Sequence, residues 1–512
     1  MMQFYQKRHF FLYFLILIMA FFIINNLIWL SQDTLPPAWD QSGHMLLSLK
    51  YYKWINEIKS VGDLKSFFAI SHYYPPFFYI SALPVISLFG FSEHKLIFIN
   101  FLYLIIFGIS IFGIGKILFN ERVGVFAAAL TLFYPIMYAL SREYLIDFSL
   151  VAMITCVQYL IFKSDGGIKK PWNIFLGIQV AFALLTKPTA LIFFLPLWVY
   201  VFLKNAKNKD DFIAFLKSIS ISLIICLPWY YSAYKDLINS ISYFNNVSTM
   251  IEHDPVEFIP SVMLYINMLK NNLISPKLLS FFILGFIFSI CSRRMRGILF
   301  MLLLWALPAF FVLVFIPSKD PRYIMPILPV FSLITVAGID CLKQKIVRNI
   351  LFCLILVIGY LQFNNLSFNV PPFLIKEKSS YCNRVPLKQD WKIKEILDFV
   401  YNRVGNKHIV IGMFPDWQFF NPPEFLLYTE LYKLPYRIAG QGYSELSLEQ
   451  IKIYDFYIIK YPNVAPPEFA YYREKFYREF GEFGMENLGF NKLAEFILPD
   501  KSKASVYQKV NN

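Results

Sequence analysis

The sequence predicts an α-helical membrane domain with about eleven transmembrane helices, followed by a small extracytoplasmic α/β domain. The 512 residues are 57% hydrophobic and 19% aromatic, which is more apolar than a soluble chain of this size requires. Apolar runs of about 20 residues with few charges recur up to residue 368, as expected for helices that cross a bilayer. From residue 369 to 512 the chain is charged and has no run of that length. We therefore predict a membrane domain over 1–368 and a soluble domain over 369–512.

The first apolar run follows a short basic stretch, in the manner of a signal peptide. Because this run is long and no small-residue cleavage site follows it, we expect an uncleaved transmembrane helix. The eleven predicted spans are roughly 10–30, 96–118, 122–140, 144–162, 172–186, 188–204, 213–232, 277–292, 297–316, 323–342 and 348–368.

The distribution of basic residues predicts the orientation. With a cytoplasmic N-terminus, every connection on the cytoplasmic side is basic. The short turns on the other side hold four basic residues, namely Arg142, Lys187, Lys319 and Arg322. The protein is thus expected in the plasma (inner) membrane, with its C-terminal domain outside. Because topology explains the net charge of +14, nucleic acid is excluded as a partner, since phosphate binding needs basic residues gathered on one polar face.

Three outer segments are too long to be turns: about 31–95, about 233–276 and everything after about 369. In the first, Pro36 and Pro37 fix the direction of the chain, and a helix is predicted from Asp40 to about Trp54. The apolar stretch 75–90 is short and interrupted by proline, so we expect a helix at the membrane surface.

The C-terminal domain shows alternating strand and helix patterns. "HIVIGMF" and "YDFYIIKY" are typical of buried strands. "PEFLLYTELYKL" and "PPEFAYYREKFYREFGEF" are typical of helices that open with proline. The pattern predicts a small α/β domain, and it contains no glycine-rich phosphate loop.

Two outer-turn cations have no topological reason to be there. Lys187 has no acidic neighbour in sequence, and Pro188 is expected to open the next helix. A cation beside the positive end of a helix dipole is unfavourable unless an anion lies there too. A bound phosphate would satisfy both, although an ordinary ion pair or a side chain extended to the interface is an alternative. Arg322 has the same two interpretations, with Asp320 as the nearby acid.

Two carboxylates at outer helix ends are further candidates. Asp147 stands near the hydrocarbon region, where an acid needs a partner or a function, and Arg142 offers an interfacial salt bridge. Asp40 is either a helix N-cap or a carboxylate that takes a proton from an attacking hydroxyl. His44 follows one turn later, so Asp40 and His44, with His72 as a third ligand, are an alternative divalent-metal site.

Several short stretches together resemble GT-C superfamily glycosyltransferases, nearest to the protein O-mannosyltransferases and the lipid A aminoarabinose transferase. They lie in the same order and on the same predicted side of the membrane. They are "PPAWDQSGH" (36–44), "HYYPPFFYI" (72–80), "SREYLIDFSL" (141–150), "LLTKPTALIFFLPL" (184–197) and "KDPRYIMPILP" (319–329).

The resemblance implies a role for individual residues. Asp40 takes the place of the catalytic aspartate, although the next residue is Gln41 where many members have glutamate. The residues in the position of the donor-phosphate site are Lys187, Arg322, Arg142 and Tyr323. The residues in supporting positions are Asp147, His44, His72 and Tyr74.

The resemblance also implies the chemistry. The donor would be a polyprenyl-phosphate-linked hexose or pentose, transferred with inversion to a lipid, glycan, cell-wall polymer or protein on the outer face. No cofactor is required, because guanidinium and ammonium groups can stabilise the leaving phosphate without a metal. The alternative is a transporter or flippase of lipid-linked sugars, which is disfavoured because the sequence shows no duplicated halves.

Overall fold

The computed structural model describes residues 2–57, 64–250, 254–370, 383–440, 451–462 and 482–510. The chain forms two compact units. The first contains Met1–Ser31, Trp54–Asn245 and Asp254–Pro386. The second contains Gln32–Lys53, Asn246–His253 and Leu387–Asn512. The contacts thus group part of the predicted first outer loop with the C-terminal domain, whereas the sequence predicted that loop as part of the membrane domain.

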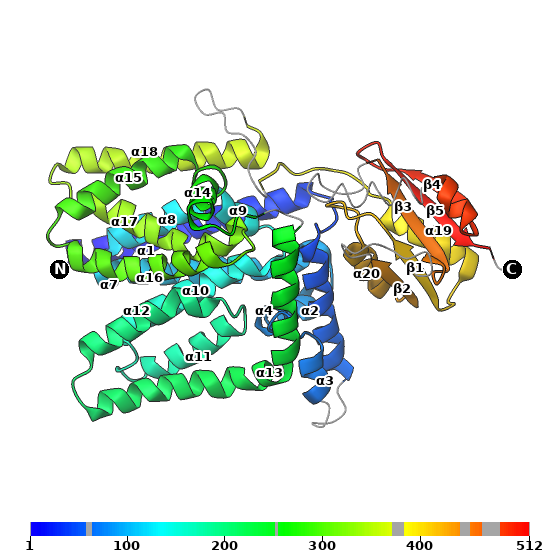
Figure 1. The fold of residues 1–512 in the computed structure, drawn as a ribbon. Coiled ribbons are helices and arrows are strands. Elements are labelled where there is room, and N and C mark those ends of the chain that lie inside the picture. Colours follow the sequence, from blue (N-terminus) through cyan, green and yellow to red (C-terminus); the bar gives the residue numbers. More distant parts are fainter. Residues whose placement is uncertain are drawn as a thin grey trace. The chain divides into compact units, whose positions relative to one another are not determined.

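The chain up to residue 370 is helical wherever it has regular structure (Figure 1). Its elements are α1 (Met2–Gln32), α2 (Asp40–Glu57), α3 (Leu64–Ala69), α4 (Phe77–Ser81), α5 (Leu83–Phe89), α6 (Glu93–Leu96), α7 (Ile99–Leu118), α8 (Glu121–Leu132), α9 (Pro135–Leu140), α10 (Ile146–Lys163), α11 (Trp172–Leu184), α12 (Ala190–Asn205), α13 (Lys209–Met250), α14 (Phe258–Met268), the π-helix η2 (Leu269–Leu273), α15 (Pro276–Cys291), α16 (Arg296–Phe315), the 3-10 helix η3 (Pro321–Ile327), α17 (Leu328–Asp340) and α18 (Lys345–Phe368).

Within the described residues, seven helices are long and apolar enough to cross a membrane, and each matches a predicted span. An eighth forms if the pair Phe258–Leu273 and Pro276–Cys291, which is bent by 114°, is one broken span. The other three predicted spans are formed by shorter helices. The span 122–140 is divided into α8 and α9 at Pro135, while α11 and α12 have 13 and 16 residues. Length alone therefore supports seven or eight of the eleven predicted crossings.

The ends of these helices meet as the predicted alternation requires. At one end, Asp340 accepts hydrogen bonds from Asn120 (2.8 Å) and Arg122 (3.1 Å), and Arg348 lies 3.7 Å away. These residues lie in or beside predicted cytoplasmic connections. At the other end, predicted outer turns contact one another, as described below. The cytoplasmic placement of the N-terminus stays a prediction.

Close packing fixes the position of α17, the helix that follows the Arg322 turn. A Cβ atom on Gly338 would lie 1.9 Å from the carbonyl oxygen of Gly285 on α15. Thr131 on α8 donates a buried hydrogen bond of 2.7 Å to Ser332 on the same α17. Small residues at helix interfaces allow backbones to approach closely, so α17 is held between α8 and α15.

The C-terminal part of the second unit is a five-stranded mixed sheet in the order β2-β1-β3-β5-β4. The strands are β1 (Ile409–Met413), β2 (Tyr436–Gly440), β3 (Phe456–Tyr461), β4 (Phe490–Ile497) and β5 (Lys503–Lys509), and the helices are α19 (Ile393–Val404), α20 (Pro422–Leu431) and α23 (Glu482–Asn487). Strand β1 is parallel to β2 and β3, whereas β5 is antiparallel to β3 and β4. The predicted strands within "HIVIGMF" and "YDFYIIKY" and the helix within "PEFLLYTELYKL" are confirmed. The second predicted helix, "PPEFAYYREKFYREFGEF", falls almost entirely outside the described residues.

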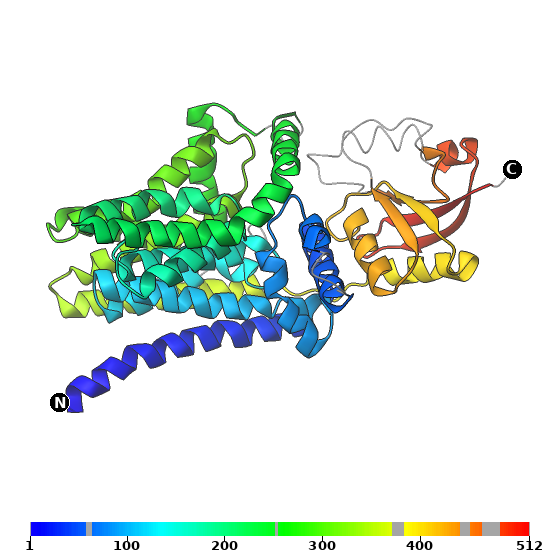
Figure 2. The same cartoon turned by 90° about the horizontal axis from the view of Figure 1, so that it is seen from below.

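Apolar clusters cover both faces of this sheet. One cluster contains Ile396 and Val400 of α19 with Ile411 of β1. The other contains Met485 of α23 with Tyr507 of β5. Figure 2 shows α19 and α23 on opposite sides of the sheet. The domain is therefore a layered α/β fold, as the alternating pattern predicted.

Candidate functional site

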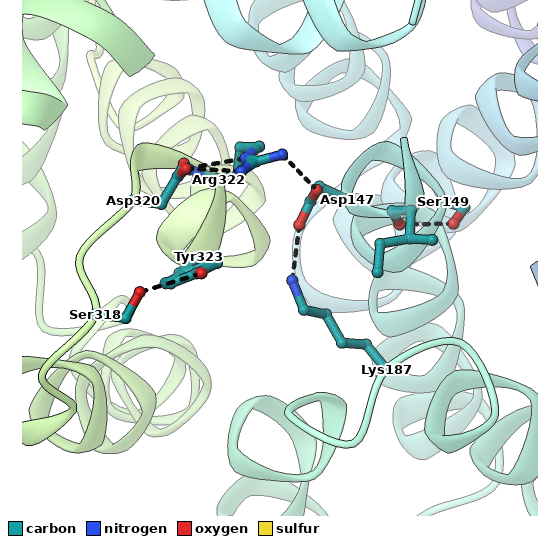
Figure 3. Close-up of polar contacts among 8 residues, drawn as sticks. Asp147, Ser149, Lys187, Ser318, Asp320, Arg322 and Tyr323 are labelled. Carbon is teal, nitrogen blue, oxygen red and sulfur yellow. Dashed lines mark hydrogen bonds and ion pairs between the residues drawn. The ribbon is translucent and has the colours of Figure 1, made fainter. Parts of the chain in front are cut away.

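Three turns of the first unit bring two cations to one carboxylate (Figure 3). The Nζ atom of Lys187 lies 3.0 Å from Oδ1 of Asp147. An Nη atom of Arg322 lies 3.9 Å from the other carboxylate oxygen. We name Lys187, Asp147 and Arg322 the cation cluster. The sequence predicted all three as candidates, but not that Lys187 and Asp147 form a direct ion pair.

Local structure explains where each member stands. Asp147 lies in the first turn of α10, where the helix dipole favours a negative charge. Lys187 lies in the turn between α11 and α12, and α12 begins at Ala190, slightly later than the predicted start at Pro188. Arg322 belongs to η3, the short helix that leads into α17. The three elements are held against one another by the packing of the bundle.

Arg322 is also bound to Asp320. The Asp320 side chain accepts hydrogen bonds from the backbone N–H of Arg322 (2.7 Å), from its Nε (3.0 Å) and from an Nη (2.9 Å). The predicted pairing of Asp320 with Arg322 therefore exists, and Asp147 lies near the same guanidinium. Two carboxylates thus restrict the rotamers of one arginine, so its planar group has a defined direction.

Tyr323 lies beside Lys187, as the resemblance implied. The Lys187 ammonium is 4.9 Å from the centroid of the Tyr323 ring, a cation–π distance. The Tyr323 hydroxyl is 3.4 Å from Oγ of Ser318 (Figure 3). The aromatic face limits the positions that the flexible lysine side chain can take.

The members of the cation cluster differ in exposure. The Asp147 side chain is 4% exposed, whereas those of Lys187 and Arg322 are 15% and 18% exposed. The carboxylate therefore lies behind the two cations, and part of each cation remains accessible. An anion that approaches from the accessible side would find two positive groups already oriented, which is the arrangement that recognises a phosphate.

The "HYYPPFFYI" stretch packs on the same end of the bundle. The backbone N–H of Phe77 donates to the carbonyl of Leu185 (3.0 Å), two residues before Lys187. The Phe78 ring lies 4.8 Å from the ring of Tyr144, three residues before Asp147. The motif stretches around residues 74–79, 141–147, 184–187 and 318–323 therefore converge within the first unit, although they are far apart in sequence.

Two residues of the same stretch have other immediate contacts. His72 forms a pair with Asp236 of α13, with 3.0 Å between Nδ1 and the carboxylate. The Tyr74 ring packs on that of Tyr73, with 4.2 Å between centroids, and its carbonyl accepts from Ser71 Oγ (2.6 Å). Among the residues that the structure describes, no group of three or more His, Cys, Asp or Glu is arranged to hold a metal ion.

Asp40 belongs to the second unit. It is the first residue of α2, so the predicted helix start is confirmed. The side chain is exposed, while His44, one turn later, is 4% exposed. Trp39, which precedes Asp40, has φ 37°, a left-handed conformation that bulky residues rarely adopt. The carboxylate thus stands at a helix N-terminus, next to an unusual backbone position.

Comparisons with known proteins agree with this architecture. Residues 74–231, which include Lys187 and Asp147, match the family described as Dolichyl-phosphate-mannose-protein mannosyltransferase. The crystal structure of ArnT from Cupriavidus metallidurans bound to undecaprenyl phosphate aligns with a TM-score of 0.56 at 13% identity, over 96% of this chain and 97% of that one. The chain therefore shares its fold with that structure, and its residues 74–231 are similar to that family.

A second solved structure also has a similar fold. The oligosaccharyltransferase AglB from Archaeoglobus fulgidus, in complex with an inhibitory peptide and a dolichol-phosphate, aligns with a TM-score of 0.59 at 12% identity. The alignment covers 98% of this chain and 74% of AglB. A search of curated proteins found no match. The resemblance to the protein O-mannosyltransferase and ArnT group therefore rests on the family match and the fold.

Arg142 has partners that differ from those of the cation cluster. It is 3% exposed, its Nε donates to the carbonyl of Tyr138 (3.0 Å), and an Nη donates to Oγ of Ser367 (3.0 Å). The guanidinium lies 5.0 Å from the centroid of the Trp29 ring. Through these contacts Arg142 joins α1, α9 and α18.

Lys319 is a residue whose environment the sequence did not indicate. It is 7% exposed, its ammonium donates to the carbonyl of Ile316, and its backbone N–H donates to Asp254 (2.7 Å). Burial lowers the pKa of Lys319 and raises the pKa of Asp254. The partners lie 65 positions apart, so no local pattern could show this contact.

Proposed function

We propose that this protein is a GT-C-type glycosyltransferase, and that it transfers a hexose or pentose, with inversion, from a polyprenyl-phosphate donor to an acceptor on the outer face of the plasma membrane. The observation that carries the proposal is the cation cluster, in which Asp147 holds Lys187 and Arg322 at one place. A lipid-linked sugar presents one phosphate at the membrane surface, and two oriented cations suit that group.

Solved structures of the same fold support this ligand class. The ArnT structure is bound to undecaprenyl phosphate, and the AglB structure is in complex with a dolichol-phosphate. Both ligands are phosphates on long isoprenoid chains, whose tails dissolve in the bilayer. The family that matches residues 74–231 is described by its use of dolichyl-phosphate-mannose. The family match also favours a transferase over a transporter or flippase.

In the proposed reaction, the acceptor hydroxyl forms a bond to the anomeric carbon as the bond from that carbon to the phosphate oxygen breaks. The phosphate leaves with the electron pair, and attack from the opposite face inverts the anomeric centre. Asp40 takes the proton of the attacking hydroxyl. Lys187 and Arg322 stabilise the negative charge that develops on the leaving phosphate.

The remaining assignments follow from the resemblance. Tyr323 limits the position of Lys187, as its ring contact suggests. Arg142 is proposed to contribute to the donor-phosphate site. Residues with proposed supporting roles are Asp147, His44, His72 and Tyr74. The acceptor belongs to one of four classes: a lipid, a glycan, a cell-wall polymer or a protein. A metal is not needed for the step, because the two cations supply the charge stabilisation.

The test compares Lys187→Ala, Arg322→Ala and Lys235→Ala. Lys235 is an exposed lysine of α13 outside the cluster, so it controls for general surface charge. Binding of undecaprenyl phosphate and transfer from its mannosyl derivative are measured in nanodiscs. A charge-assisted hydrogen bond is worth about 1.5–3 kcal/mol. Binding and transfer should therefore each fall by about ten- to a hundredfold in Lys187→Ala and in Arg322→Ala. Equal losses in all three variants would refute the phosphate site.

A further inference from the structure

The segment that leads into Asp40 pairs with the start of the C-terminal domain. The backbone N–H of Thr34 donates to the carbonyl of Leu387 (2.9 Å), and the N–H of Leu387 donates to the Asp33 carboxylate (2.9 Å). The N–H of Gln389 donates to Oγ1 of Thr34 (3.0 Å). Residues 33–39, which we name the anchor segment, thus begin with three hydrogen bonds to a part of the chain more than 350 positions away.

A side chain of the anchor segment is part of the domain core. Leu35 is 4% exposed and belongs to the same apolar cluster as Trp391, Ile396 and Phe425. Those residues lie in α19, in α20 and just before α19. Leu35 therefore completes the core of the C-terminal domain. Burial of a leucine is a stronger restraint than a surface contact, since removal of the side chain leaves a cavity.

The last residue of the anchor segment is fixed by the loop between β1 and α20. The N–H of Trp39 donates to the carbonyl of Gln418 (3.3 Å). That carbonyl also accepts from the Asn421 side chain (3.3 Å), and Asn421 forms a capping box with Glu424 at the start of α20. Trp39 with its left-handed backbone therefore binds to a loop that is itself held by a helix cap.

The helix that begins at Asp40 is attached to the domain a second time. Lys53 on α2 pairs with Glu430 near the end of α20, with 2.5 Å between Nζ and the carboxylate. Both side chains are more than a third exposed, so this pair adds orientation more than stability. Contacts before Asp40 and contacts after it thus come from the same domain.

We infer that the C-terminal α/β domain positions the Asp40 carboxylate, and that Leu35 and Trp39 are the positioning residues through which it does so. The inference rests on the proposed role of Asp40 as base. A general base must lie within hydrogen-bond reach of the proton that it removes, and small displacements cost much rate. The domain is then a structural part of the catalytic apparatus, and not only an appended module.

The test uses Leu35→Ala with Leu498→Ala as a matched control. Both leucines are buried in the same core cluster, at 4% and 2% exposure, but Leu498 lies outside the anchor segment. Leu35→Ala should lower kcat by about ten- to a hundredfold with little change in donor KM. Its backbone amides in residues 36–50 should exchange hydrogen faster. Leu498→Ala should keep kcat within about threefold, and Leu35→Met should restore most of the activity.

Asp33→Ala is a milder second variant, since it removes the acceptor for the Leu387 N–H but leaves the Leu35 side chain in the core. Like Leu35→Ala, it should lower kcat with little change in donor KM and speed hydrogen exchange, but the loss of kcat should be smaller. Equal losses of kcat in Leu35→Ala and Leu498→Ala, or unchanged exchange in residues 36–50, would overturn the inference. Failure of the proposed function is seen separately, because Asp40→Asn would then keep its turnover while hydrogen exchange still reports on the anchor segment.

Discussion

The ammonium of Lys187 lies 3.0 Å from the carboxylate of Asp147, although the two residues are 40 positions apart, one in the turn between α11 and α12 and the other in α10. The pair gives Lys187 the acidic partner that its sequence neighbourhood lacks. It also gives Asp147 a reason to be buried at the start of α10. A pair of this kind orients the cation and, at the same time, partly neutralises it, and the two effects lead to opposite predictions for binding and for turnover.

Asp147→Asn should separate these two effects. Asparagine removes the negative charge that repels a phosphate, so binding of undecaprenyl phosphate should stay within about threefold of the parent. It also removes the charge that aligns Lys187 and Arg322, so turnover should fall by about tenfold or more, because stabilisation of the leaving phosphate needs correct alignment. Lipid-phosphate binding and single-turnover transfer measure the two quantities. If both fall together, Asp147 acts only through the fold.

Asp40→Asn tests the proposed base. Asparagine has nearly the same size and capping ability as aspartate but cannot accept a proton at neutral pH. General-base catalysis is typically worth about 100- to 10,000-fold, so transfer should fall at least about a hundredfold. Expression and donor binding should be almost unchanged. Turnover within about threefold of the parent would leave Asp40 as a residue of the helix start without a part in the chemistry.

Hydropathy and charge predict most of the membrane domain, because an apolar run needs no knowledge of its neighbours. The helix division at Pro135 and the break before α15 both have a local signal, since proline opens α9 and α15 there. The residues of the cation cluster were predicted individually. Their ion pairs were not, because those depend on how three turns meet. The association of Leu35 with the C-terminal core was also invisible, since it joins segments at opposite ends of the chain.

The predicted orientation is tested by labelling single cysteines in a cysteine-free background. Lys407→Cys lies at an exposed position of the C-terminal domain, which we expect outside the cell membrane. Lys204→Cys lies at an exposed position in a predicted cytoplasmic connection. An impermeant maleimide should label residue 407 in intact cells and residue 204 only after permeabilisation. The reverse pattern would invert the topology and place the cation cluster on the cytoplasmic side.

The C-terminal domain contains a buried ion pair whose stability should depend on pH. The Lys460 side chain is 0% exposed and pairs with Asp500 at 2.8 Å. Burial lowers the pKa of Lys460. The pKa of Asp500 is also lowered, because hydrogen bonds from Lys460 and Ser502 outweigh the opposite effect of burial. The depressed Asp500 pKa adds stability above about pH 4, which is lost as pH falls through the folded-state value.

The two groups act at opposite ends of the pH scale. For Lys460, the unfolded chain binds the proton more tightly than the folded one, so stability rises as pH increases from the folded-state pKa towards about 10.4. Asp500→Asn leaves the buried ammonium without its carboxylate and should cost about 3–5 kcal/mol at neutral pH. The substitution should also remove the loss of stability at acid pH that comes from the depressed Asp500 pKa. Hydrogen exchange of β3 amides in the full chain, measured as a function of pH, reports both effects.

Glu495→Gln is the matched control for that substitution. Glu495 bridges Lys492 (2.8 Å) and Lys503 (2.7 Å), and its side chain is 30% exposed. Surface ion pairs contribute little to stability because water and salt screen them. The β3 amides of this variant should therefore exchange hydrogen almost as fast as those of the parent. If Asp500→Asn proves as mild as Glu495→Gln, then water reaches Lys460 and the ion pair is not the buried support that its 0% exposure indicates.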